Sequence, residues 1–156
     1  MTWDFKHFKS DSKIDKWGDA SKIDLDLVLR LDRLRQFLGH PIYVTSGYRS
    51  KDMNWHGKGK ALDITVPTWD DGLFELYLAA ERFSFQGLGV YRDWFFQGRL
   101  CGGLHVDSRP LDGQAAARWL CVREGSEACK HPIDVIGIKQ KYVGLNQDNL
   151  YEYGII

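Results

Sequence analysis

The sequence has no long hydrophobic run and no excess of charge of either sign. No apolar stretch approaches the about 20 residues that a helix needs to cross a bilayer, so we expect no membrane span. Acidic and basic residues are balanced at 21 each, which gives no electrostatic reason for a nucleic-acid or anionic-membrane partner. The N-terminal segment is polar and lacks the apolar region of a signal peptide, so we expect synthesis in a cytoplasm.

Cysteine is also scarce. The three cysteines form no CxxC pair, which argues against a disulfide framework and against a thiolate zinc site. We expect each to act as a small buried hydrophobic residue, although a bridge between Cys121 and Cys129 stays open. Repeats, low-complexity tracts and Pro/Ser-rich linkers are absent too, so the 156 residues predict one domain, residues 1–156, with its own core.

Hydrophobic periodicity divides the chain into alternating helices and strands. Apolar residues recur at helical spacing after Ser21 and Asp24, either of which can cap a helix that Gly39 ends. Asp112 similarly predicts the start of a later short helix. Helices are expected over residues 22–38, 69–83, 113–121 and 146–153, and strands over 41–49, 61–66, 85–91 and 104–107. This interspersed order predicts the α+β class.

Two of these strands carry the residues of greatest chemical interest. Strands 61–66 and 104–107 each place apolar side chains on one face, with Asp63 on the polar face of the first and His105 on that of the second. If the strands are neighbours, these side chains can meet, and His56 can reach them from a glycine-rich turn. Two imidazoles and a carboxylate, with a position left for water, form a catalytic zinc set. The alternative for each of these residues, taken alone, is an ordinary position on the surface or in the core without a metal.

Four motifs occur in a fixed order: SGYRS at 46–50, HGKGKALDI at 56–64, GLGVY at 87–91 and HVDSR at 105–109. This set resembles the zinc D-Ala-D-Ala carboxypeptidase and L-alanyl-D-glutamate endopeptidase family, whose fold is shared with the hedgehog signalling domain. The resemblance covers about residues 20–120. It implies a small antiparallel sheet with flanking helices and a cleft that carries one zinc ion (Zn2+). It also implies hydrolysis of peptide bonds in peptidoglycan stem peptides.

The resemblance assigns roles by position. The implied zinc ligands are His56, Asp63 and His105. Arg49 falls on the family arginine that binds the substrate and helps to hold the developing oxyanion, a task that suits a planar, permanently charged guanidinium. Candidates for substrate contact are Ser46, Tyr48 and Tyr91, each with a packing or turn role as the alternative.

The sequence departs from the family at the general base. Relatives often carry an acidic residue or a histidine three positions before the second histidine ligand, where this chain has Gly102. Asp107 shares a strand face with His105 and is therefore a catalytic candidate, either as the base or as a carboxylate that orients His105. We favour the orienting role. Asp93 is a more distant candidate for the base.

The leading hypothesis is a peptidoglycan peptidase of the phage- or prophage-type endolysin or virion-associated kind. Such a protein is made in the cytoplasm and acts on the cell wall after release, or is carried in a virion, and we expect a monomer. A different hypothesis is an inactive zinc-containing binding module on the same fold, which Gly102 favours. A dipeptidase for free D,D-dipeptides is a third. The motifs leave open which peptide bond is cleaved.

Overall fold

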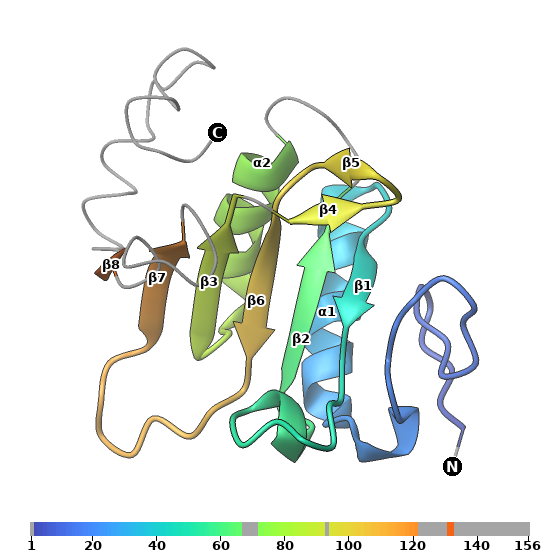
Figure 1. The fold of residues 1–156 in the computed structure, drawn as a ribbon, viewed down its shortest axis with the longest axis horizontal. Coiled ribbons are helices and arrows are strands. Elements are labelled where there is room, and N and C mark those ends of the chain that lie inside the picture. Colours follow the sequence, from blue (N-terminus) through green and yellow to red (C-terminus); the bar gives the residue numbers. More distant parts are fainter. Residues whose placement is uncertain (1, 67–71, 93, 122–130, 133–156) are drawn as a thin grey trace.

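A six-stranded sheet forms the centre of the computed structural model, which describes residues 2–66, 72–92, 94–121 and 131–132. The sheet order is β1-β2-β6-β3-β7-β8, and both α-helices lie on the same face of it (Figure 1). The sheet strands are β1 (Tyr43–Ser46), β2 (Ala61–Thr65), β3 (Gly87–Tyr91), β6 (Gly103–Asp107), β7 (Ala117–Cys121) and β8 (His131–Pro132). A separate hairpin consists of β4 (Phe95–Phe96) and β5 (Arg99–Leu100). The helices are α1 (Leu25–Leu38) and α2 (Gly72–Ala80), with short 3-10 turns η1 (Ala20–Lys22), η2 (His56–Lys58) and η3 (Glu81–Phe83). The predicted α+β class is confirmed.

The sheet is mixed, which corrects the expectation of a purely antiparallel one. The pairs β1–β2, β2–β6, β3–β6 and β7–β8 are antiparallel, whereas β3 and β7 run parallel. The reason is topological. After β6 the chain crosses over β3 and adds β7 on the far side of that strand. Both β3 and β7 run opposite to β6, so they run parallel to each other.

The predicted helix over residues 113–121 is wrong, because residues 117–121 form strand β7. Asp112, the expected cap, instead lies in a turn with a positive φ of 47°. Arg118 ties the strand in place by donating from Nε to Glu81 Oε1 at 2.6 Å and from Nη2 to the Phe85 carbonyl at 3.0 Å. Tertiary pairing therefore overrides the helical preference of the alanine run.

The other helices agree more closely with the sequence. Asp24 caps α1 by accepting a hydrogen bond from the Asp26 backbone, and Gly39 ends it in the left-handed conformation. Residues 72–83 of the second predicted helix form α2 and η3. The expected helix over 146–153 and Cys129 of the possible bridge lie outside the described residues. No helix in the described ranges has the length and apolar character to cross a membrane.

The core lies between the helices and the face of the sheet that they cover. Many of its fully buried members come from α1, α2 and alternate positions of the central strands: Leu27, Leu31, Leu34, Leu62, Ile64, Leu76, Leu88, Leu104 and Val106. Since side chains alternate along a strand, the polar residues of β2 and β6 point to the opposite face, which the helices do not cover. Residues 2–19, which we call the N-terminal arm, add aromatic side chains to this core and lie at the β1 edge (Figure 1).

Candidate metal centre

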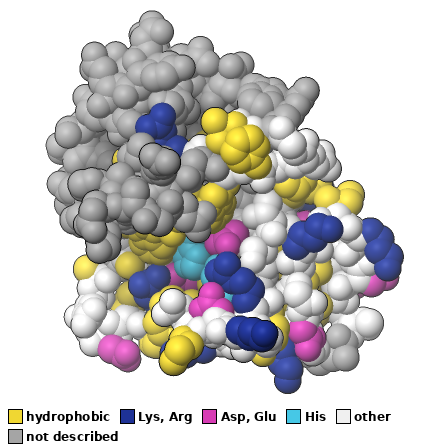
Figure 2. All heavy atoms as spheres, in the orientation of Figure 1, with side chains coloured by type: hydrophobic (Ala, Val, Ile, Leu, Met, Phe, Trp, Pro, Cys, Tyr) yellow, Lys and Arg dark blue, Asp and Glu magenta, His cyan; other side chains and the backbone are white. Residues whose placement is uncertain are grey.

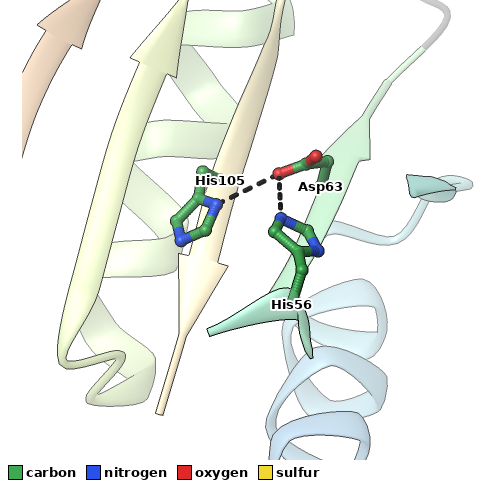
Figure 3. Close-up of side chains that lie close together, drawn as sticks. All are labelled: His56, Asp63 and His105. Atoms are coloured by element: carbon green, nitrogen blue, oxygen red, sulfur yellow. Dashed lines mark hydrogen bonds and ion pairs between the residues drawn. The ribbon is translucent and has the colours of Figure 1, made fainter. Parts of the chain in front are cut away.

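Three side chains from separate segments converge on the face of the sheet that the helices do not cover. His56 comes from η2, Asp63 from β2 and His105 from β6, and Asp63 is the direct antiparallel partner of His105. The predicted adjacency of the two strands is confirmed. Asp63 Oδ1 lies 3.1 Å from His56 Nε2 and 3.1 Å from His105 Nδ1 (Figure 3). One ligand atom of each residue lies within 4.8 Å of the others, so the group could hold a metal ion.

The outer nitrogens of both imidazoles already have acceptors. His56 Nδ1 lies 2.7 Å from the Gly47 carbonyl oxygen, and His105 Nε2 lies 2.8 Å from Asp107 Oδ2. A carbonyl and a carboxylate can only accept, so these two nitrogens carry the hydrogens. The inward nitrogens both face the Asp63 carboxylate, to which they donate when they carry a hydrogen and beside which they offer a lone pair to a metal when they do not. Two imidazole nitrogens and one carboxylate oxygen that lie this close together form a ligand set that suits zinc.

In the metal-free protein the surrounding carboxylates favour a proton on His105. Burial lowers the pKa of His105, but hydrogen bonds to Asp107 and Asp63 raise it, and the net result lies above its ordinary value. Burial raises the pKa of Asp63, while hydrogen bonds from His105 and His56 lower it, and the net result is below the ordinary value. A metal ion that binds here must therefore displace a proton from the histidine side of the group.

The turn that carries His56 depends on glycine. Gly59 ends η2 with a φ of 69°, and a Cβ atom there would lie 1.8 Å from the Lys22 carbonyl oxygen. A Cβ atom at Gly57 would lie 1.7 Å from the Asp52 carbonyl oxygen. Close backbone packing on both sides leaves His56 almost completely buried and aimed at β2. The expected sharp reversal between the first two members of the group is confirmed.

Asp107 is completely buried, and its oxygens are occupied. Arg109 donates to it from Nε at 2.8 Å to Oδ1, from Nη2 at 2.5 Å to Oδ2 and from the backbone N–H at 3.1 Å to Oδ1, in addition to the His105 contact. Burial raises the pKa of Asp107, but the hydrogen bonds from Arg109 and His105 prevail and lower it to about 2. The carboxylate thus contacts the outer nitrogen of His105 and lies on the side of the ring away from Asp63.

An aromatic wall, formed by Trp55, Trp119 and Tyr91, stands beside the group. The Arg109 guanidinium lies 5.6 Å from the Trp55 ring and 5.3 Å from the Trp119 ring, while Trp119 lies 5.2 Å from the His105 ring. Trp119 Nε1 donates to the Tyr91 hydroxyl at 3.1 Å. Sequence reasoning missed Trp119 because its segment was predicted as a helix, and it missed Arg109 although this residue lies only two positions after Asp107 in the HVDSR motif.

The two glycines of GLGVY make room for this arrangement. Gly87 pairs with Asp107 in the sheet, and a Cβ atom at residue 87 would lie 2.1 Å from Asp107 Oδ2. Gly89 pairs with His105, and its Cβ atom would lie 2.2 Å from Trp119 Cε2. A side chain at either position would therefore displace the carboxylate or the indole.

The other predicted site residues differ in how closely they approach the metal group. Arg49 is half exposed, with Nη2 at 3.9 Å from Asp63 Oδ2 and Nε at 3.3 Å from Asp52 Oδ2. Ser46 is the β1 partner of Asp63, whereas Tyr48 packs against the hydrophobic core. On the surface, histidine is flanked by Lys or Arg and by Asp or Glu side chains (Figure 2). The expected cleft around the group stays a prediction.

Gly102 occupies the position where relatives carry the general base, and the structure leaves no space for one. Its φ is 65°, and a Cβ atom would lie 2.6 Å from Leu73 Cδ2 and 2.7 Å from the Tyr91 carbonyl oxygen. A carboxylate at this position would require the backbone at Tyr91 and the Leu73 side chain to move. Asp93, the distant alternative, lies outside the described residues.

Comparison with known proteins gives one result. Residues 6–96, more than half of the chain, match the family model described as Peptidase M15. The matched segment contains Arg49, His56 and Asp63 and ends before His105. No curated protein and no solved structure matches.

Proposed function

The chain belongs to the peptidase M15 family, and on that basis we propose that it is a zinc metallopeptidase that hydrolyses peptide bonds in peptidoglycan stem peptides. The observation that carries the proposal is the convergence of His56 Nε2, His105 Nδ1 and the Asp63 carboxylate. Both outer nitrogens are engaged by acceptors, which fixes the rings in the form that binds a metal.

Zinc would be held by His56 Nε2, His105 Nδ1 and the Asp63 carboxylate, and when bound it polarises a carbonyl and lowers the pKa of its water. Arg49 lies beside Asp63 with its side chain half exposed, so its charge can bind the substrate and stabilise the oxyanion as it develops. Asp107 orients His105. The proposed substrate contacts are Ser46, Tyr48 and Tyr91; for Tyr48, packing against the core favours a structural role.

A second candidate function is a zinc-containing binding module without catalytic activity. Two observations favour it: Gly102 has no room for a base, and Asp107 has its oxygens engaged by Arg109 and His105. A buried carboxylate with a pKa of about 2 is a poor proton acceptor near neutral pH. If the protein is an active peptidase, its base comes from another group.

Purified cell walls distinguish the two functions. We expect the zinc-loaded protein to release new amino groups from the walls, and expect chelation or His56→Ala to abolish the release. Mass spectrometry of the digested muropeptides would then identify the bond and separate carboxypeptidase from endopeptidase action. Stoichiometric zinc without amino-group release would support the binding module.

The biological setting is a further part of the proposal. A phage- or prophage-type lysin, made in the cytoplasm as a single-domain monomer and acting on the wall after release or from a virion, agrees with the motif order.

A further inference from the structure

The N-terminal arm runs along the free edge of β1 and reaches the loop that follows this strand. Lys16 N–H donates to the Val44 carbonyl at 2.9 Å, and Val44 N–H donates to Asp15 Oδ1 at 2.9 Å. One step further, Tyr48 N–H donates to the Trp17 carbonyl at 2.7 Å. The arm therefore continues the hydrogen-bonding of the sheet up to the Gly47–Tyr48 peptide.

The contact between arm and loop is made by two glycines that leave no room for side chains. A Cβ atom at Gly47 would lie 2.4 Å from the Trp17 carbonyl oxygen. A Cβ atom at Gly18, whose φ is 74°, would lie 2.1 Å from the Tyr48 carbonyl oxygen. Backbone thus packs directly on backbone, and the Gly47–Tyr48 peptide cannot move toward the arm.

The same peptide holds a member of the metal group on its other side. The Gly47 carbonyl oxygen accepts from His56 Nδ1 at 2.7 Å, and His56 is only 3% exposed. Any shift of this carbonyl changes the hydrogen bond that decides which ring nitrogen carries the hydrogen. The carbonyl is thus the link between the arm and the metal group.

Trp17 anchors the arm firmly enough to serve as a support. Its side chain is 3% exposed, with the Trp3 ring at 4.9 Å and the Phe8 ring at 5.8 Å in edge contacts. Its Nε1 donates to the Lys9 carbonyl at 3.0 Å. The indole is thus fixed by packing and by a hydrogen bond, and its backbone carbonyl is fixed with it.

We propose that Trp17 and Gly18 are positioning residues for His56 and act through the Gly47–Tyr48 peptide. The arm fixes the Gly47 carbonyl, the carbonyl keeps a hydrogen on Nδ1, and Nε2, which faces Asp63, is left as the nitrogen that can bind the metal. This inference rests on the proposed function in one respect, namely that His56 is a metal ligand. Loss of an outer partner of a ligand histidine typically weakens metal binding by about 10–100-fold.

The test compares Gly18→Ala with Gly39→Ala in the full chain. Both glycines have a φ of 74°, so alanine strains the backbone equally, but nothing lies within 4 Å of a Cβ atom at Gly39. Zinc affinity is measured by competition with a chelating dye, after circular dichroism has confirmed folding. We expect Gly39→Ala to bind zinc like the wild type and Gly18→Ala to bind it about 10-fold or more weakly.

Nitrogen NMR of the imidazole rings adds a measurement that a purely structural role would not change. In the metal-free wild type at mildly alkaline pH, we expect His56 to carry its hydrogen on Nδ1, and expect Gly18→Ala to lose this preference. Wild-type zinc affinity together with a wild-type ring spectrum in Gly18→Ala would overturn the inference. If Gly18→Ala does not fold, the wild-type spectrum decides, because a hydrogen on Nε2 also overturns the inference.

The experiments distinguish a failure of this inference from a failure of the proposed function. A wild type that binds zinc, loses affinity in Gly18→Ala and leaves cell walls intact contradicts the peptidase but supports the positioning role. A wild type that binds no zinc contradicts the metallopeptidase, while the ring spectra still show whether the arm fixes the tautomer.

Discussion

Replacement of Asp107 by asparagine tests how the His105 ring is held. The substitution keeps the size of the side chain and removes one charge and one acceptor in a completely buried place. The amide oxygen can still accept from Arg109, which then forces the amide N–H group toward His105 Nε2. Two N–H groups cannot face each other, so the ring moves its hydrogen to Nδ1, the atom that faces the metal position.

Two independent estimates give a similar size for the loss of zinc affinity in Asp107→Asn. A buried donor left without its acceptor costs about 1–3 kcal/mol. Loss of the outer partner of a ligand histidine weakens metal affinity by about 10–100-fold, which corresponds to about 1.4–2.8 kcal/mol. We therefore expect zinc to bind Asp107→Asn about 10–100-fold more weakly than it binds the wild type.

The assay is turnover on isolated muropeptides as a function of free zinc, with zinc affinity measured separately. We expect saturating zinc to restore most of the turnover of Asp107→Asn, since the change affects the ring and not the reacting atoms. Asp52→Asn is the matched control: it removes another carboxylate at the site, one that pairs with Arg49 at 3.3 Å and contacts neither histidine. Its zinc affinity should equal that of the wild type.

Two results would refute the orienting role. Normal zinc affinity with low turnover at every zinc concentration would identify Asp107 as the missing base, because an amide cannot accept the proton. Normal affinity with normal turnover would leave Asp107 without either role, despite its contacts with His105 and Arg109.

Three further measurements follow from the same geometry. Arg49→Ala should keep fold and metal but lose about a hundredfold or more in turnover at saturating zinc, and turnover within a few fold of the wild type would remove Arg49 from the site. Gly89→Ala should lower the unfolding free energy by about 1–3 kcal/mol by overpacking against Trp119; thermal unfolding of the variant and the wild type checks this. Zinc affinity should rise with pH past the ordinary histidine pKa of 6.5, because His105 holds its proton above that value in the metal-free protein; a pH-independent affinity in a dye titration contradicts it.

The period-two pattern of the central strands is what made the metal group predictable from the sequence. Leucine, isoleucine and valine alternate with Asp63 in one strand and with His105 in the other, so only one face of each could be polar. Because the apolar faces pack against the helices, the polar residues of both strands lie together on the face of the sheet that the helices do not cover. Capping residues fixed α1 for a similarly local reason, since Asp24 and Gly39 act within one turn of its ends.

Two partners of the group, Trp119 and the Gly47 carbonyl, could not be predicted because they depend on contacts between distant segments. Trp119 reaches His105 only because β7 pairs with β3, and the alanine run before it indicates a helix when considered alone. The Gly47 carbonyl is a backbone atom, so no side-chain pattern marks it as the partner of His56. Trp17 looks like any buried aromatic residue until its carbonyl is placed beside Tyr48.

The position of β6 in the sheet has a consequence for how the protein assembles. The strand lies between β2 and β3, both of which leave the ribosome before it (Figure 1). Until β6 inserts, these two strands have no common neighbour, and the group lacks the histidine that stands 42 residues after Asp63. Such non-local pairing is slow compared with helix formation. Closure of the sheet and completion of the zinc-binding group are therefore a single folding event, and a partly synthesised chain carries no competent centre.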